Sequence, residues 1–161
     1  MRQVALTWLA ALPLLAAGCG PQVQVEKALA ITDLQTGWYD AGIVEGNKNK
    51  LIPSVVFRLH NVSSQPVAGV QVNAIFRRVT EQEGWGEHFA QAIGSSGLAP
   101  GATTRDIVLR SNLGYTGTQP RMQLLQNREF VDAKVDIFAK QGSRTWAKIG
   151  NYTIDRQLLT R

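Results

Sequence analysis

Few side chains in this sequence could carry out covalent or metal chemistry, and they do not converge on one motif. Cys19 is the only cysteine, and His60 and His88 are the only histidines. A zinc site needs three or four such ligands, so no metal site is predicted. The glutamates within 81–87 lack the spacing of a calcium-binding loop, and the serines within 94–97 lack the spacing of a nucleophile elbow. We expect no cofactor and no enzymatic activity; the alternative is an active site assembled from residues distant in sequence.

The chemistry that the sequence does indicate is acylation of Cys19. A basic residue, Arg2, precedes an apolar run over 4–17 that is too short for a stable membrane-spanning helix, and Cys19 follows directly after Ala-Ala-Gly. This segment resembles the signal peptide of bacterial lipoproteins, in which the cysteine thiol is acylated and the chain is cut before it. The resemblance implies a signal peptide at 1–18 and a lipid anchor on Cys19. The alternative is an ordinary secretory signal beside a coincidental cysteine.

The residue after the cysteine and the net charge bear on location and partners. Gly20 stands where an aspartate favours retention in the inner membrane, so the resemblance implies the outer membrane in a Gram-negative host. The full chain has a net charge of +5, which becomes +4 without Arg2, and its basic residues are dispersed. This mild excess favours anionic headgroups or cell-wall polymers over nucleic acid, with simple solubility as the alternative. The sequence does not identify a small-molecule ligand.

Alternation of apolar and polar residues predicts one all-β domain at 28–158, joined to the lipidated cysteine by a polar tether at 19–27. Residues 20–27 reach at most about 26 Å at roughly 3.3 Å per residue, so the domain should lie against its membrane. About seven short strands separated by turns favour a single antiparallel two-sheet immunoglobulin-like sandwich, with a closed barrel as the alternative. The expected strands are 28–39, 54–62, 67–79, 89–93, 102–111, 130–140 and 144–155.

Two local irregularities are predicted within this pattern. The apolar parity of the first strand slips near Asp33, which indicates a β-bulge. One short helix is expected between Thr118 and Asn127, with Thr118 as its cap and Pro120 in its first turn. We expect this helix to cross from one sheet to the other.

Residues 51–111 carry a family resemblance. A strand ends in Asn61-Val62-Ser63, a Val-x-x-Val-x-Val pattern follows at 67–72, and Leu98-Ala99-Pro100-Gly101 introduces a further strand. The pattern is similar to the FxLYD-type and related late-embryogenesis-abundant-like sandwich domains of bacterial envelope proteins. It departs from them at Phe76-Arg77-Arg78, where the family has an aromatic residue followed by Asp. The resemblance implies an immunoglobulin-like scaffold with a binding or accessory role.

Two aromatic residues flanked by glycines are the candidate partner contacts. Trp85 lies between Gly84 and Gly86, and Tyr115 lies in a Gly-Tyr-Thr-Gly segment. Aromatic side chains on loop tips can form a platform for a protein or a glycan. The competing interpretation is that each folds back and closes one end of the sandwich. Trp38 and Trp146 are assigned to the core or its rim.

These predictions together favour a non-catalytic, lipid-anchored envelope protein. Its partners would be the membrane, through the acyl chains on Cys19, and another envelope protein, through the loops that carry Trp85 and Tyr115. The alternative is a glycan- or cell-wall-binding module that uses the same aromatic residues.

Overall fold

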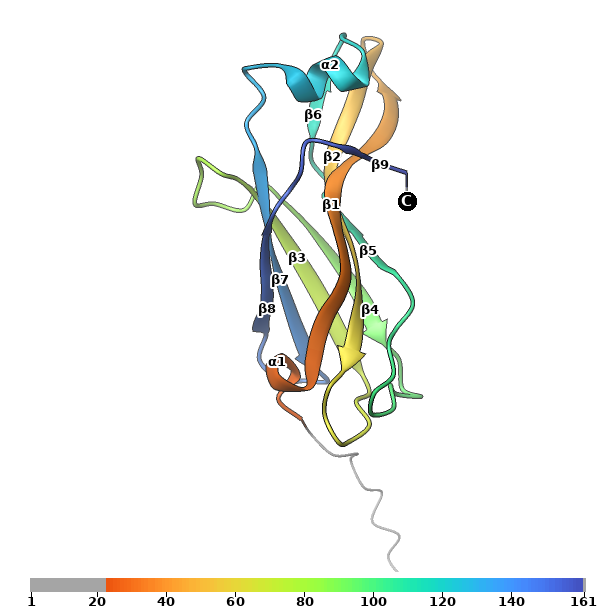
Figure 1. Cartoon of the computed structure of the whole chain (residues 1–161). Helices are drawn as coiled ribbons and strands as arrows, with labels where there is room; N and C mark the ends of the chain where they lie inside the picture. The colour runs from red at the N-terminus through yellow and green to blue at the C-terminus, as the bar shows by residue number, and fades with distance from the viewer. Residues whose placement is uncertain (1–22, 161) are drawn as a thin grey trace, which may run out of the picture.

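The apolar alternation of the sequence becomes two packed β-sheets in the computed structural model, which describes residues 23–160 (Figure 1). The predicted signal peptide and Cys19 lie outside the described residues. The first sheet has the order β5-β2-β1-β9, and β6 also pairs with β2. Its strands are β1 (Leu29–Val44), β2 (Lys48–Asn61), β5 (Ile107–Arg110), β6 (Tyr115–Gly117) and β9 (Leu158–Leu159).

The second sheet has four strands in the order β4-β3-β7-β8, and all of its pairings are antiparallel. The two sheets do not close into one cylinder, which confirms the two-sheet sandwich and excludes the barrel alternative. Two short helices complete the described chain, α1 before β1 and α2 between β6 and β7. The remaining bounds are β3 (Val70–Arg78), β4 (Gly86–Ile93), β7 (Ala133–Gln141), β8 (Ala147–Thr153), α1 (Val25–Ala28) and α2 (Arg121–Gln126).

The strand count and one strand direction differ from the prediction. Residues 23–160 form nine strands rather than about seven, because two short strands, β6 and β9, join the first sheet. β9 runs parallel to β1, with Leu158 opposite Trp38, so the first sheet is not wholly antiparallel. A side chain at Gly37 would meet the carbonyl oxygen of Gln157 at 2.8 Å, so the glycine lets the C-terminal segment reach β1.

The core follows the predicted alternation closely. On β7, every second residue from Ala133 to Ala139 is fully buried, and the same holds for Val70 to Phe76 on β3. They pack against buried side chains of the first sheet, and this burial is the main favourable contribution to folding. The largest fully buried side chains are Trp38, Phe57, Phe76, Leu51, Leu59 and Leu109.

The predicted irregularities are present, with one correction. The β1–β2 register shifts between Thr32 and Gln35, and Asp33 takes a positive φ of 51°, which confirms the bulge. The helix α2 connects the two sheets, as predicted. However, Thr118 does not cap it: the helix begins after Pro120, whose carbonyl accepts from the Leu124 amide, and no side chain caps its start.

The folded part begins earlier than the predicted boundary at residue 28. Val25 and Ala28 are only 4% and 3% exposed and join the core through the short helix α1. The amide of Val23 donates to Oε1 of Gln141 at 3.1 Å, and Nη1 of Arg144 donates to the Val23 carbonyl at 3.3 Å. The stretch between Cys19 and the first of these attached residues is therefore 20–22, which is shorter than the predicted tether.

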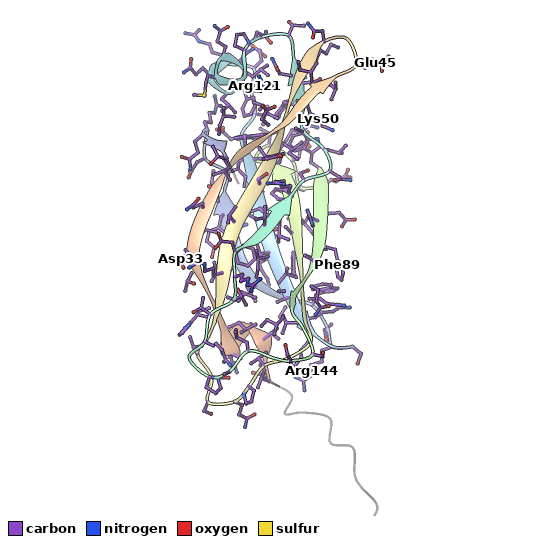
Figure 2. All side chains as sticks on the ribbon, turned by 90° about the vertical axis from the view of Figure 1, so that its right-hand side faces the viewer. Asp33, Glu45, Lys50, Phe89, Arg121 and Arg144 are labelled. Atoms are coloured by element: carbon purple, nitrogen blue, oxygen red, sulfur yellow. The ribbon has the colours of Figure 1, made fainter. Side chains whose placement is uncertain are left out.

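The two ends of the sandwich differ in what they carry. The base is the end where residue 23 enters, formed by α1, the β7–β8 hairpin and the loops at 62–69 and 94–106 (Figure 1). The distal end carries the β1–β2 hairpin, α2 and the loops at 79–85 and 111–114. Figure 2 shows Arg144 at the base, and Glu45 and Arg121 at the distal end. Within residues 23–160, neither helix has the length or apolarity to cross a bilayer.

Candidate functional site

Four aromatic rings meet between the sheets in the distal half of the sandwich. Trp38 comes from β1 and Tyr115 from β6, both in the first sheet, whereas Trp85 immediately precedes β4 of the second sheet and Phe130 lies just before β7. We call these four residues the aromatic cluster. The structure therefore brings the two predicted contact residues together, although they are thirty positions apart in sequence.

The rings of the aromatic cluster form a continuous contact. The centroid distances are 4.6 Å for Trp38–Phe130, 4.5 Å for Tyr115–Phe130 and 5.0 Å for Trp85–Tyr115. Tilted or edge-on pairs at such distances each contribute roughly 0.5–1.5 kcal/mol beyond their burial. Trp38 is fully buried at the centre, while Trp85 and Tyr115 are partly exposed at the margin. The cluster therefore stabilises the contact between the two sheets and also reaches the surface.

The glycines beside Tyr115 have a packing role that the sequence did not reveal. A side chain at Gly114 would overlap the carbonyl oxygen of Leu51, and one at Gly117 would overlap Leu124 of α2. These glycines allow β6 to lie against β2 and the helix. Tyr115 is the first residue of strand β6, so the prediction that it lies on a loop tip is wrong.

The glycines beside Trp85 act similarly. A side chain at Gly86 would overlap Ser111 in the β5–β6 connection, and one at Gly84 would meet Ile75 at 3.2 Å. The Trp85 amide donates to the carbonyl of Phe76 at 2.7 Å. Glycine on both sides of Trp85 therefore reflects close approach of neighbouring segments, which fix the indole against the sandwich.

One hydrogen bond and two cationic side chains contact the rings of the aromatic cluster. The Tyr115 hydroxyl donates to the carbonyl of Val131 at 3.1 Å. Burial raises the pKa of Tyr115 above its ordinary value of 10.0, and the positive charge of Arg78 opposes this shift only in part. Two guanidinium groups lie over cluster rings, that of Arg78 at 5.6 Å from the Trp85 centroid and that of Arg156 at 5.3 Å from the Phe130 centroid. Because its pKa is raised above 10.0, Tyr115 is neutral at physiological pH.

Two recesses open beside the cluster. One, of about 240 Å³, is lined by Trp85 together with Glu87 and Asn112. Another of the same volume is lined by Tyr115, Phe130 and Leu124 of α2. Each predicted contact residue thus presents one side to a shallow, mixed polar and apolar hollow, while its other side packs inward. This arrangement suits contact with a ligand or partner.

The two histidines and Glu81 make contacts within the fold. His88 Nδ1 lies 2.9 Å from the carbonyl oxygen and 3.0 Å from the amide nitrogen of Arg110, which ties β4 to β5 where the two sheets adjoin. His60 Nδ1 lies 2.9 Å from Oγ1 of Thr103 at the surface. Glu81 pairs with Arg78 at 2.9 Å. Across residues 23–160 no cluster of three or more potential metal ligands is found.

A buried ionic network lies on the outer face of the second sheet. The Asp136 side chain is only 8% exposed; Arg77 donates to its Oδ2, while Lys148 and Asn151 donate to its Oδ1 at 2.8 and 2.6 Å. Burial raises the pKa of Asp136, but the hydrogen bonds from Lys148 and Asn151 and the charges of Lys148 and Arg77 together lower it below 3.8. The burial of this carboxylate was not predicted from the sequence.

The residues of the family resemblance meet at the base. Asn61 is fully buried, and its amide donates to the carbonyls of Gln65 and Leu98, both at 2.9 Å. Its Oδ1 accepts from the amide and hydroxyl of Ser63 at 3.0 and 2.7 Å. The Asn-x-Ser and Leu-x-Pro-Gly segments are thus joined by one side chain that ties two base loops together.

Trp38 and Trp146, both predicted to lie in the core or its rim, have different surroundings. Trp38 lies in the core, as predicted. Trp146 is 37% exposed and packs edge-on against Phe89 with centroids 6.0 Å apart, while Nζ of Lys140 lies 4.8 Å from its ring centroid. The assignment of Trp146 to the core or its rim is therefore wrong, because the β7–β8 hairpin carries this ring onto the surface.

No known family model matches this sequence, and a search of curated proteins finds no relative.

Proposed function

We propose that this protein is a non-catalytic envelope protein, anchored to a membrane through Cys19, that binds another envelope protein through its distal end. The proposed anchor rests on the lone cysteine and the apolar segment before it. The proposed binding role rests on the distal end of the sandwich, where the aromatic cluster reaches the surface. An outer-membrane location in a Gram-negative host belongs to the same proposal.

The observation that carries the proposal is the position of the chain's entry point relative to the aromatic cluster. Val23 is fixed to the β7–β8 hairpin at the base, whereas Trp85 and Tyr115 lie in the distal half. A lipid anchor on Cys19 would hold the base near the bilayer and leave the distal end facing away from it. A partner in the periplasm or in another layer would then meet the distal end first.

Exposed apolar side chains on the distal loops and helix support the same choice. Ile43 at the end of β1 is 64% exposed, Met122 on α2 is 49% exposed and Leu113 between β5 and β6 is 47% exposed. Single exposed apolar residues are common on any surface. Several on neighbouring loops beside partly exposed aromatic rings fit the apolar centre of a protein interface.

Photo-crosslinking in native membranes tests the partner. A photoreactive residue at Ile43 or Met122 should capture the same envelope protein, and one at Phe89, which is 54% exposed on the second sheet, serves as the matched control. Replacing Trp85 with Ala should then weaken capture. Equal crosslinking from Phe89, or unchanged capture by Trp85→Ala with a lowered melting temperature, would assign the cluster to the core alone.

A Cys19→Ser variant tests the anchor separately. It should leave the membrane fraction because the acylation site is lost, and the wild-type protein should be extracted only with detergent. A serine variant that stays equally firmly in the membrane fraction contradicts the proposed anchor.

The glycan-binding alternative is favoured by one observation, the recess where Trp85 lies beside Glu87 and Asn112. Polar groups next to an indole suit the ring and hydroxyls of a sugar. Purified peptidoglycan fragments or polysaccharide should then change Trp85 fluorescence, and a Trp85→Phe variant identifies its share of the signal. No change at millimolar ligand removes this alternative.

A further inference from the structure

We infer that the base of the sandwich is a membrane-contacting surface, with Trp146 at the lipid–water interface and the neighbouring cations against anionic headgroups. This inference rests on the proposed lipid anchor and adds an orientation to it. Its first support is the length of chain between the anchor and the fold. Residues 20–22 separate Cys19 from Val23. The Cα atoms of Cys19 and Val23 can therefore be at most about 14 Å apart, at roughly 3.3–3.6 Å per residue.

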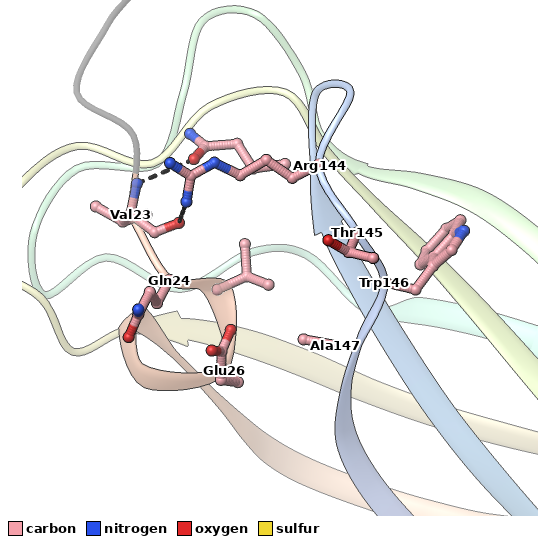
Figure 3. A pocket seen from close by; sticks show the side chains of 9 residues that line it. Val23, Gln24, Glu26, Arg144, Thr145, Trp146 and Ala147 are labelled. Carbon is pink, nitrogen blue, oxygen red and sulfur yellow. Dashed lines mark hydrogen bonds between the residues drawn. The ribbon is translucent and has the colours of Figure 1, made fainter.

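That short reach acts on the base directly because Val23 is itself fixed. Its amide and carbonyl are bound by Gln141 and Arg144, and Val25 two residues later is buried (Figure 3). The β7–β8 hairpin therefore cannot move away from Val23 without breaking these contacts. An acyl anchor on Cys19 would hold this hairpin within about one to two Debye lengths of the headgroups, where one Debye length is about 8–10 Å at physiological ionic strength. Charges on the hairpin would then still interact with charged headgroups.

The charges at the base suit an anionic surface. Lys27 on α1 and Arg144 on the hairpin are exposed, and Lys140 lies beside Trp146. The exposed carboxylate on these two segments is that of Glu26, so the cations outnumber it. A basic residue close to an anionic bilayer contributes about 1 kcal/mol to binding, which is about a fivefold change in population.

Trp146 adds an apolar contact of the kind found at membrane interfaces. Trp146 is 37% exposed and follows Arg144 and Thr145 along the hairpin, at the edge of a recess of about 390 Å³ that Val23 and Glu26 also line. Its ring points away from this recess, on the other side of the hairpin (Figure 3). Tryptophan is enriched at the headgroup level because one part of the ring is apolar and its N–H is polar. The recess gives headgroups room to approach the hairpin.

Tryptophan quenching by lipid measures this contact. The acylated full chain is reconstituted in phosphatidylcholine vesicles with and without phosphatidylglycerol, with bromine atoms on the lipid near the headgroup. After loss of the predicted signal peptide the tryptophans are Trp38, Trp85 and Trp146. We expect quenching in anionic vesicles that is kept in Trp85→Phe and lost in Trp146→Phe.

Charge variants test the headgroup contribution. Lys27→Gln with Lys140→Gln should lower the ratio of docked to undocked protein about 25-fold, at about fivefold for each lysine. Lys48→Gln with Lys50→Gln at the distal end is the matched control and should leave the ratio unchanged. Quenching that is the same in neutral and anionic vesicles, or equal in both variants, overturns the charge contribution.

The outcomes separate this inference from the proposed function. Protein that stays vesicle-bound through Cys19 but shows no quenching of Trp146 overturns the orientation and leaves the anchor intact. Wild-type protein that fails to bind vesicles, like its Cys19→Ser variant, overturns the anchor and the orientation with it.

Discussion

Replacing Asp136 with Asn tests whether the network on the outer face of the second sheet stabilises the fold. The substitution keeps the shape of the side chain and removes its charge. The variant leaves in place the donor groups of Arg77, Lys148 and Asn151 but removes the carboxylate that accepts from them. Because the Asp136 side chain is 8% exposed, water replaces these bonds poorly.

The expected loss of stability follows from the exposure of each partner. Breaking a fully buried ion pair costs about 3–5 kcal/mol, whereas an exposed pair contributes about 0–1 kcal/mol. The Arg77 side chain is 21% exposed and that of Lys148 is 51% exposed, so the network lies between these limits. We expect a loss of about 2 kcal/mol, which for a domain of this size lowers the melting temperature by roughly 6–10 °C.

The pH dependence gives a second measurement. Although burial raises the pKa of Asp136, its cationic and amide partners lower it more, to below the ordinary 3.8. A carboxyl with a lowered folded-state pKa stabilises the protein above its unfolded pKa and loses that contribution as the pH falls through its folded pKa. The stability difference between wild type and Asp136→Asn should be full at neutral pH and shrink below about pH 4.

Urea unfolding at a series of pH values, followed by circular dichroism, measures both quantities. Glu81→Gln removes the exposed pair with Arg78, in which the side chains are 39% and 36% exposed, and should cost less than about 1 kcal/mol. Equal losses in the two variants, or a difference for Asp136→Asn that persists unchanged at pH 2, would refute the assignment of a stabilising role to the buried carboxylate.

Two further substitutions test how close packing and polar burial shape the loops. Gly114→Ala should cost about 1–3 kcal/mol because the added methyl overlaps the Leu51 carbonyl, whereas Gly94→Ala, with open space around it, should stay within about 0.5 kcal/mol; equal thermal shifts contradict this. Asn61→Ala should cost about 3 kcal/mol by removing the amide that donates to the Leu98 and Gln65 carbonyls and the oxygen that accepts from Ser63, and hydrogen exchange should speed up in both base loops; unchanged protection there contradicts the bridging role.

Sequence reasoning was most successful where a side chain's position depends on its neighbours in sequence. The buried rows of β3 and β7 follow from a period of two, and the bulge at Asp33 follows from a slip in that period. The crossover helix was predicted from local signals as well, although Pro120, and not Thr118, is the residue at its cap position and the helix begins at Arg121. Local patterns cannot fix a helix start within a few residues.

The candidate site was predicted only in part. Trp85 and Tyr115 were selected because glycines flank them, which is a local signal. The reason for two of those glycines is not local, since Gly114 makes room for Leu51 and Gly86 makes room for Ser111, both distant in sequence. The central ring of the cluster, Trp38, was placed in the core without its contacts being foreseen.

The sequence by itself determined the all-β sandwich, the facing of its strands and the candidate acylation site, because alternation and short motifs are properties of adjacent residues. The tertiary structure decided the partners of each residue across space. It placed β9 parallel to β1, buried Asp136 among three donors and carried Trp146 to the surface at the base. Those outcomes depend on how two sheets and their loops pack together, and no window of neighbouring residues contains that information.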